Sequence, residues 1–339
     1  MNSTSDEFEY PPVLDVGPII EFKARVRAHR TYSKRDTEFC GHTNNLYYNC
    51  EASHRGVGTE LRAVCVIAQA GSGKTSMIRH HLARLPYFKP TVDEFGDEVS
   101  PILCVKLKPS STGKSMLRQL LKAMQIYGGY SKANESELVD LVVGHMKDLG
   151  YRYLFIDELQ HGARGTKDGY LKQMQDALRG VIDHDDWPVH AILAGTEEVL
   201  PILKEPQLRR RTYKMRLQPL SLKYVDIVKT LMNNVIVKAA GMNFSFDDDD
   251  EIEKRLMHAA NYAMGTAILL LQEACFDAFI EGKATIDIAT MEKIYRIKSG
   301  CIRPDNIFLV DNFESIRPIN SLSDMLLGVA EDGDHDASN

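Results

Sequence analysis

The sequence predicts an α/β fold in which helices cover both faces of a parallel sheet, followed by a small helical lid. Three observations indicate this fold. Short apolar segments with strand character alternate with helical segments up to about residue 220. A glycine-rich loop stands between the first strand and the helix that follows it. Beyond about residue 220 the strand pattern nearly vanishes, and apolar residues recur at helical spacing.

The elements of the sheet region can be placed one by one. Strands as short and uniformly apolar as these are typical of a parallel sheet that is buried on both faces. The strands are expected at 62–68, 102–108, 153–157 and 189–195, and the helices at about 74–85, 115–126, 135–149 and 168–183.

The 339 residues are enough for about two domains. We expect the sheet and its helices to form one domain and the later helices to form the lid. A basic, partly helical segment precedes the sheet, and a weakly patterned acidic segment follows the lid and is expected to be partly flexible. The predicted parts are an N-terminal adaptor segment at 1–50, the α/β domain at 51–220, the helical lid at 221–300 and the C-terminal tail at 301–339.

Composition narrows the class of protein. Apolar residues make up 44% and charged residues 26% of the chain, as in an ordinary globular protein. No apolar run approaches the roughly 20 residues that a membrane span needs. The first twelve residues, MNSTSDEFEYPP, lack the basic start and apolar stretch of a secretory signal. We therefore expect a cytoplasmic protein with no membrane partner.

Charge and cysteines leave two questions open. The net charge of −6 does not indicate nucleic-acid binding, but the basic runs at 25–30 and 209–211 leave a DNA-contacting face possible. The six cysteines are too scattered for a disulfide framework. Four residues could together bind a zinc ion: Cys40, His42, Cys50 and His54. Their spacing matches no usual zinc motif, and loop residues without a metal are the alternative.

The loop AQAGSGKT, Ala68 to Thr75, carries the strongest chemical signal. It follows a strand and opens a helix, which is the context of a phosphate-binding P-loop. Lys74 would pair with the β and γ phosphates of ATP, and Thr75 would offer its hydroxyl to magnesium. Ala68 stands where the full motif has glycine, at the position least involved in phosphate contact. The expected nucleotide-binding residues are Ala70, Gly71, Ser72, Gly73, Lys74, Thr75 and Ser76.

The strand LFIDE ends in two carboxylates, Asp157 and Glu158. Ligands bind at the carboxyl edge of parallel sheets, so these side chains are expected beside the loop. Asp157 would hold magnesium together with Thr75, and Glu158 would orient and deprotonate the attacking water. Two solvated carboxylates at a strand end are the alternative.

Two further polar groups follow the next strand. Thr196 stands where a hydroxyl or amide could sense the γ-phosphate, although a threonine after a strand is often only a helix cap, here for the segment 197–204. The run Arg209, Arg210 and Arg211 is costly to bury. One of these arginines could act as an arginine finger on a neighbouring subunit's nucleotide, with Arg211 the first choice and Arg210 the second. A solvated basic face or a DNA-backbone patch is the alternative.

The order of these motifs resembles the TniB/TnsC family of AAA+ transposition regulators over roughly residues 25–300. The most specific part is GTEEVLPIL followed by PQLRRR, and the lid segment YAMGTAILLLQEA also fits. The resemblance implies an AAA+ P-loop NTPase fold and a homo-oligomer, a ring or helical filament, around double-stranded DNA. It also implies partners: a transposase and a target-selection protein of the TniQ kind, including those of CRISPR-associated transposons.

One position departs from many AAA+ proteins. Their lid carries a sensor arginine in Gly-x-x-Arg, whereas this chain has Ile268 three residues after Gly265. This departure favours a slow switch over a fast motor. DNA contacts are harder to place, because binding to the DNA backbone needs only basic and small polar side chains. The candidates are Thr112, Lys114, Arg164 and Lys167, and ordinary solvated loops are the alternative.

Two rival functions share the core motifs. A replication-initiator or helicase-loader ATPase would be expected to carry a winged-helix domain after the lid, and only about forty residues follow residue 300. A nucleotide-dependent scaffold would have no DNA role. The prediction from sequence is therefore an ATP-dependent and magnesium-dependent ATPase that oligomerises on duplex DNA and links target selection to the transposase.

Overall fold

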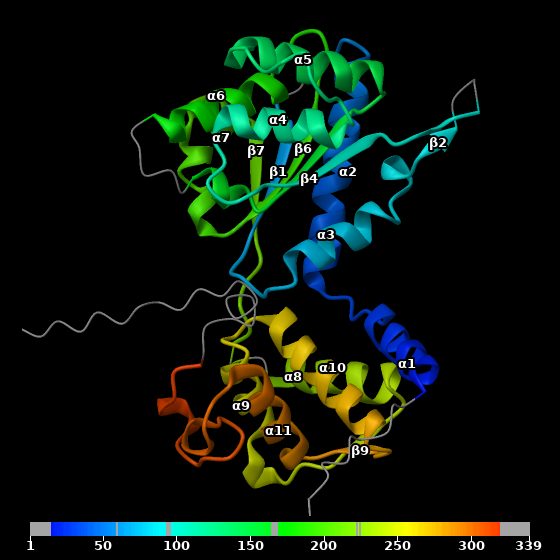
Figure 1. Ribbon diagram of the computed structural model, residues 1–339, viewed down its shortest axis with the longest axis vertical. Helices are drawn as coiled ribbons and strands as arrows, with labels where there is room; N and C mark the ends of the chain where they lie inside the picture. The colour runs from blue at the N-terminus through cyan, green and yellow to red at the C-terminus, as the bar shows by residue number, and fades with distance from the viewer. Residues whose placement is uncertain are drawn as a thin grey trace, which may run out of the picture. The chain divides into compact units, whose positions relative to one another are not determined.

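The computed structural model describes residues 15–58, 60–92, 96–163, 169–221, 223 and 225–318. These residues form two compact units (Figure 1). The sheet unit contains residues 32–220 and 263–266, and the helical unit contains residues 15–31, 221–262 and 267–318. The segment 1–50, expected to be a separate adaptor, is therefore divided: its first helix belongs to the helical unit and its second to the sheet unit.

A five-stranded parallel sheet forms the centre of the sheet unit and confirms the predicted α/β class. Its strand order is β4-β5-β6-β1-β7, which places β1 between β6 and β7. The four predicted strands are present, and β7 joins them at the edge. The strands are β1 (Ala63–Ile67), β4 (Ile102–Lys106), β5 (Tyr153–Asp157), β6 (His190–Gly195) and β7 (Thr212–Arg216).

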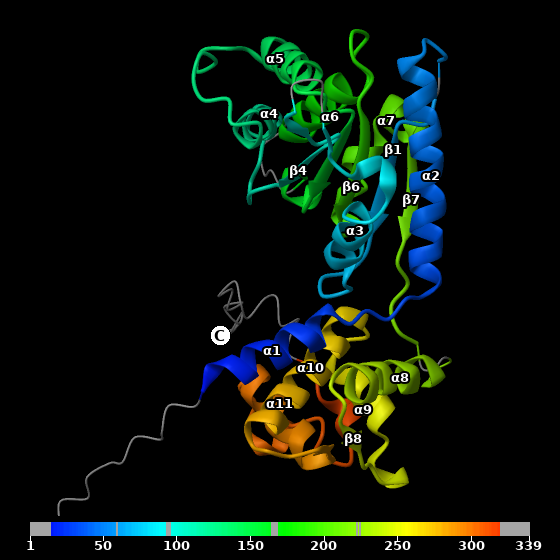
Figure 2. The same cartoon turned by 90° about the vertical axis from the view of Figure 1, so that its right-hand side faces the viewer.

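Helices cover both faces of this sheet because its strand residues are apolar on both sides. Cys65 and Ile67 of β1 face one core with α4 (Gly113–Ala123), α5 (Glu135–Asp148) and α6 (Tyr170–Ile182). Val64 and Val66 face the other core, with α2 (Lys34–His54) and α3 (Lys74–Leu82). Figure 2 shows α4, α5 and α6 on one side of the sheet and α2 on the other.

The remaining elements of the sheet unit are short. The segment 197–204, expected as a helix, forms two 3-10 turns interrupted near Pro201. These elements are η1 (Pro86–Phe88), β2 (Thr91–Val92), β3 (Glu98–Val99), η2 (Leu159–Gly162), η3 (Glu197–Val199), η4 (Ile202–Lys204) and α7 (Pro206–Arg211).

The helical unit has the predicted helical character and adds one small parallel strand pair, β8 (Asn243–Phe244) with β9 (Thr285–Ile286). Its first helix is held by Phe22, whose ring stacks on Phe279 at 4.0 Å between ring centroids. The helices and turns are α1 (Val16–Ala28), α8 (Val225–Met232), the π-helix η6 (Asn233–Ala239), η7 (Asp248–Asp250), α9 (Ile252–Ala259), α10 (Met264–Ile280), α11 (Ile288–Ser299), η8 (Arg303–Asp305) and η9 (Phe313–Ser315).

The beginning of the expected C-terminal tail is packed. Arg255 of α9 donates from Nη1 to the carbonyl oxygens of Ile307 at 2.6 Å and Val310 at 2.7 Å. Its guanidinium also lies over the ring of Phe313. Residues 319–339, the rest of that tail, lie outside the described residues. In the described parts of the chain, no helix combines the length and hydropathy needed to span a bilayer.

Candidate nucleotide-binding site

The predicted loop and carboxylates meet at one edge of the sheet. β1, β4, β5 and β6 run parallel, so their carboxyl ends lie at the same edge. The loop Ala68–Thr75 follows β1, Asp157 ends β5 and Thr196 follows β6. The loop is tied to β6, since the Ala68 amide donates to the Gly195 carbonyl oxygen at 3.1 Å.

The loop has the backbone that a phosphate cradle needs. Gly71 and Gly73 adopt φ angles of +70° and +83°, which favour glycine. Gly73 caps α3, so the free amides of the first helical turn open toward the loop. The loop also packs tightly on the start of α10. The Thr266 amide donates to the Gly71 carbonyl oxygen at 2.9 Å, and a Cβ on Gly265 would lie 2.7 Å from the Gly73 nitrogen.

Two buried polar groups of the loop have no partner in the part of the chain that the structure describes. Lys74 is only 6% exposed, and no ion pair or hydrogen bond to its ammonium is found among the described residues. The Ser72 hydroxyl is likewise buried and unpartnered within the described chain. Burying a lone ammonium is costly unless an anion meets it. The loop therefore fits a phosphate-bearing ligand.

Thr75 and Asp157 lie together as expected for a magnesium site. The Thr75 hydroxyl donates to the two carboxylate oxygens of Asp157 at 3.0 and 3.2 Å, and Asp157 is 1% exposed. Hydroxyl and carboxylate oxygens are the ligands that Mg²⁺ prefers, and it usually takes one or two protein ligands beside the substrate phosphates. This oxygen pair, next to the loop, fits that requirement.

Glu158 is placed by an unusual backbone. Its φ of +57° and ψ of +39° lie in the left-handed region, and its amide donates to Asp157 Oδ1 at 3.0 Å. The half-buried side chain accepts a hydrogen bond from Nε2 of Gln160 in η2. Glu158 is therefore held beside Asp157 at the carboxyl edge of the sheet, next to the loop, and its carboxylate could accept a proton there.

Thr196 does not act as a helix cap. Its hydroxyl makes no capping hydrogen bond to the 3-10 turn η3, and Oγ1 is buried without a partner in the described chain. Its amide donates to Gln160 Oε1 at 3.3 Å. Among the described residues, Thr196 and Ser72 thus both have a buried hydroxyl without a partner at this edge of the sheet.

The three arginines of α7 have different surroundings. Arg211 pairs with Asp183 at 3.0 Å and lies close to Arg62, which also contacts Asp183 at 3.8 Å. Arg211 precedes β7, so in its own chain it lies at the amino edge of the sheet, opposite the nucleotide loop. Arg209 and Arg210 are exposed. Of the two predicted finger residues, Arg210 is thus the freer to reach another molecule.

The predicted DNA contacts are only partly described. The Thr112 hydroxyl accepts the Ser115 amide at 3.2 Å and caps α4, and Lys114 lies half-buried in the first turn of that helix. Both follow β4 on the carboxyl side of the sheet. Arg164 and Lys167 lie outside the described residues.

The possible zinc ligands do not gather. They do not lie in a loop but along helix α2: Cys40, His42, Cys50 and His54. The described residues contain no group of three or more metal-ligating side chains.

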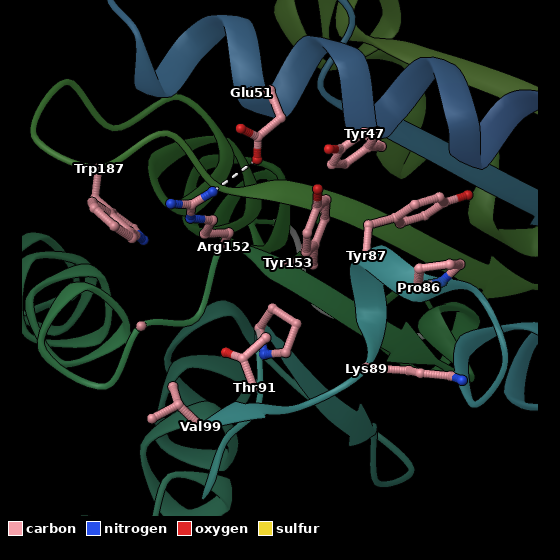
Figure 3. Close-up of a pocket in the computed structure, with 12 residues that line it drawn as sticks. Tyr47, Glu51, Pro86, Tyr87, Lys89, Thr91, Val99, Arg152, Tyr153 and Trp187 are labelled. Atoms are coloured by element: carbon pink, nitrogen blue, oxygen red, sulfur yellow. Dashed lines mark hydrogen bonds and ion pairs between the residues drawn. The ribbon is translucent and has the colours of Figure 1, made fainter. Parts of the chain in front are cut away.

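α2 borders a cavity of about 700 Å³ at the amino edge of the sheet (Figure 3). Tyr47 stacks on Tyr87 at its rim, with 4.7 Å between ring centroids. This cavity is separate from the nucleotide loop.

Sequence reasoning missed Gln160 and Gly195. Gln160 is 4% exposed and contacts both Glu158 and Thr196. Gly195 has no room for a side chain, because a Cβ there would lie 2.7 Å from Gln160 Oε1. A glutamine two residues after the acidic pair carries no signal of this role in the sequence alone.

Together, the strand order, the glycine loop at the end of β1 and the acid pair at the end of β5 define an AAA+ type P-loop ATPase fold. A family model described as "Bacterial TniB protein" matches residues 53–222, half of the chain. The chain belongs to this family, which confirms the resemblance seen in its motifs.

Solved structures agree on the fold. The chain is similar to the Aeropyrum pernix ORC2 protein (ADPNP-ADP complexes) with a TM-score of 0.51 and 13% identity, over 77% of this chain and 68% of that one. It is similar to the Aeropyrum pernix ORC1 protein in complex with DNA with a TM-score of 0.51 and 15% identity, over 76% of this chain and 65% of that one. The chain thus spans about two thirds of these proteins. No curated protein matches the sequence.

Proposed function

We propose that this chain binds and hydrolyses ATP with magnesium and, as an oligomer on duplex DNA, regulates transposition. The observation that carries the ATPase role is the set of polar side chains at the loop that a nucleotide and its metal ion would contact. Lys74 and Ser72 are buried and have no partner among the described residues, and Thr75 lies within hydrogen-bond distance of Asp157. A triphosphate would provide partners for Lys74 and Ser72, and its metal ion would take the oxygens of Thr75 and Asp157 as ligands.

Each residue of the site would have a separate role in ATP binding and hydrolysis. The loop amides and Lys74 bind the phosphates, and Thr75 with Asp157 holds magnesium, which supplies charge neutralisation to the phosphate oxygens when bound. Glu158 accepts a proton from water as the water oxygen bonds to the γ-phosphorus. The bond from that phosphorus to the β–γ bridging oxygen breaks, giving ADP and inorganic phosphate. The Thr196 hydroxyl, which has no partner in the described part of the chain, would hydrogen-bond to the γ-phosphate.

A neighbouring copy would complete the site. Charge on the transferred phosphoryl group is stabilised in many P-loop ATPases by an arginine from another subunit. Arg210 is exposed, whereas Arg211 is paired with Asp183, so we assign the finger to Arg210. ATP bound between subunits would then favour a ring or filament, and hydrolysis would release it. Ile268, in place of a lid arginine, supports a slow switch.

The DNA role rests on membership of the TniB family and is supported by the fold shared with a protein solved in complex with DNA. Thr112, Lys114, Arg164 and Lys167 are our candidates for contacts to the DNA backbone. The partners would be a target-selection protein of the TniQ kind and a transposase. Contacts to phosphates alone would make binding independent of DNA sequence and sensitive to salt.

Two variants test the ATPase role. Lys74→Ala should abolish ATP binding, measured by titration with a fluorescent ATP analogue, because the phosphates lose their cation. Glu158→Gln should keep ATP binding and ATP-dependent oligomers while hydrolysis falls by about a hundredfold or more, as expected on losing a general base. Normal hydrolysis by Glu158→Gln would refute the assigned base, and unchanged ATP affinity in Lys74→Ala would refute the phosphate loop.

Binding to duplex DNA separates this function from its rivals. With a non-hydrolysable ATP analogue, the wild-type chain should bind duplexes of unrelated sequence, and affinity should fall steeply as salt is raised. Lys74→Ala should bind more weakly under the same conditions. A chain that hydrolyses ATP but binds no DNA at low salt would be a nucleotide-dependent scaffold instead.

A further inference from the structure

Gln160 bridges two parts of the site. Its Nε2 donates to Glu158 Oε2, and its Oε1 accepts the Thr196 amide at 3.3 Å. These partners fix the orientation of the side-chain amide, since a flipped amide would set its oxygen against a carboxylate and its NH₂ against an N–H. With 4% exposure, Gln160 is shielded from water that could replace either bond.

The surroundings of Gln160 leave its side chain little freedom. A Cβ on Gly195 would lie 2.7 Å from Gln160 Oε1 and 2.3 Å from Val199 Cγ1, so the end of β6 accommodates the amide only because residue 195 is glycine. The Gly195 carbonyl oxygen in turn accepts the Ala68 amide at the start of the nucleotide loop. A continuous set of contacts thus joins the loop, the end of β6, Gln160 and Glu158.

We infer that Gln160 is a positioning residue that holds the Glu158 carboxylate in place for water activation and couples it to the end of β6. The inference rests on the proposed ATPase function. Any shift of Thr196 when its hydroxyl meets a γ-phosphate is passed through the Gln160 amide to Glu158. Gln160 thereby makes the general base responsive to the nucleotide without touching the nucleotide itself.

Two variants separate this role from simple packing. Gln160→Met keeps the side-chain length but loses both hydrogen bonds. Gln160→Glu keeps an acceptor for the Thr196 amide and loses only the donor to Glu158. Both should lower kcat for ATP hydrolysis by about tenfold or more while KM and ATP affinity change by no more than about twofold, because Gln160 acts through the base. Retained ATP affinity also reports that each variant is folded.

A matched control uses another bridging glutamine. Gln175 of α6 donates to the Pro201 carbonyl oxygen at 2.9 Å and contacts no carboxylate of the site. Gln175→Ala should leave kcat close to the wild-type value.

A double-mutant cycle shows whether Gln160 acts through Glu158. In a Glu158→Gln background, single-turnover rates should be nearly unaffected by Gln160→Met, since the group that Gln160 positions has been removed. The inference is overturned if Gln160→Glu hydrolyses ATP at the wild-type rate, or if Gln160→Met lowers the rate by the same factor with and without Glu158. Failure of the ATPase function itself would look different: the wild-type chain would not hydrolyse ATP.

Discussion

At the scale of single residues, Glu158 stands out because its backbone adopts a left-handed conformation. A left-handed backbone at a residue other than glycine costs roughly 1–3 kcal/mol and persists only where its surroundings hold it. Here the Asp157 carboxylate holds the Glu158 amide, and Gln160 holds its side chain. This strain at Glu158 supports the role of general base that we propose for its carboxylate.

Arg210 and Arg211 of α7 lead to opposite predictions. Arg210→Ala should leave thermal stability unchanged but lower ATP hydrolysis by the oligomer, because an exposed finger is lost. Arg211→Ala should destabilise the fold by about 1–3 kcal/mol, because it removes a partner from the largely buried Asp183. Urea unfolding and ATPase assays on both variants measure this. If Arg211→Ala keeps full stability and loses hydrolysis, the finger is Arg211.

The positions of the loop and of the acid pair could be predicted from the sequence because each is a contiguous motif next to a strand. The loop Ala68–Thr75 follows β1, and Asp157 ends β5, so the parallel sheet alone brings the two motifs to the same edge. Gln160 could not be foreseen in the same way. Its contact with Glu158 depends on a positive φ and a 3-10 turn, which are set by packing and not by residue pattern.

At the scale of elements, the four predicted strands of the sheet are confirmed because a buried parallel strand appears as a short apolar run. The placement of α1 and α2 was not predictable. Both helices are largely polar. Only a few buried residues, such as Phe22 in α1 and Phe39 in α2, determine the unit in which each helix packs. The two-residue strands β8 and β9 are too short to give a periodic signal.

The packing of α4 against α6 depends on Gly113. A Cβ there would lie 2.4 Å from the Gln173 carbonyl oxygen, a backbone atom that cannot move aside alone. Gly113→Ala should therefore destabilise the chain by about 1–3 kcal/mol, measured by urea unfolding.

Gly144 provides the matched control for this substitution. It lies within α5, and a Cβ there meets nothing within 4 Å. Gly144→Ala should raise stability by about 0.5–1 kcal/mol through helix propensity. Equal effects of the two substitutions would contradict the close approach of α4 and α6.

The β6 strand carries a group that makes the fold sensitive to acid. Burial, followed by the nearby charge of Arg62, lowers the pKa of His190 to about 3. Below about pH 6.5 the His190 imidazole is therefore protonated in the unfolded chain but stays neutral in the folded chain. The free energy of unfolding consequently falls as the pH drops. This histidine alone should cost about 2 kcal/mol at pH 5 relative to neutral pH.

His190→Leu tests this acid sensitivity, because leucine is similar in size and does not titrate. Unfolding free energies are compared for wild type and variant near pH 5 and pH 7.5. The wild type should lose more stability than the variant between the two conditions. An identical loss in both would show that His190 is not held neutral.

At the scale of the whole molecule, the chain combines a sheet unit that contains the nucleotide loop with a helical unit. The start of α10 belongs to the sheet unit and packs on that loop through Gly265 and Thr266. The loop at 68–75 is therefore in direct contact with the residues at the start of α10. This contact is made between backbone atoms, the Thr266 amide and the Gly71 carbonyl oxygen, and it supports the switch that we propose.

The most direct test of the central claim is a crystal structure of the chain grown with a non-hydrolysable ATP analogue and Mn²⁺, examined in an anomalous difference map. The account predicts the triphosphate within the 68–75 loop, with Lys74 at its phosphates and one Mn²⁺ peak beside Thr75 and Asp157. A loop filled by protein side chains, or a manganese ion bound elsewhere with the loop empty, would contradict it.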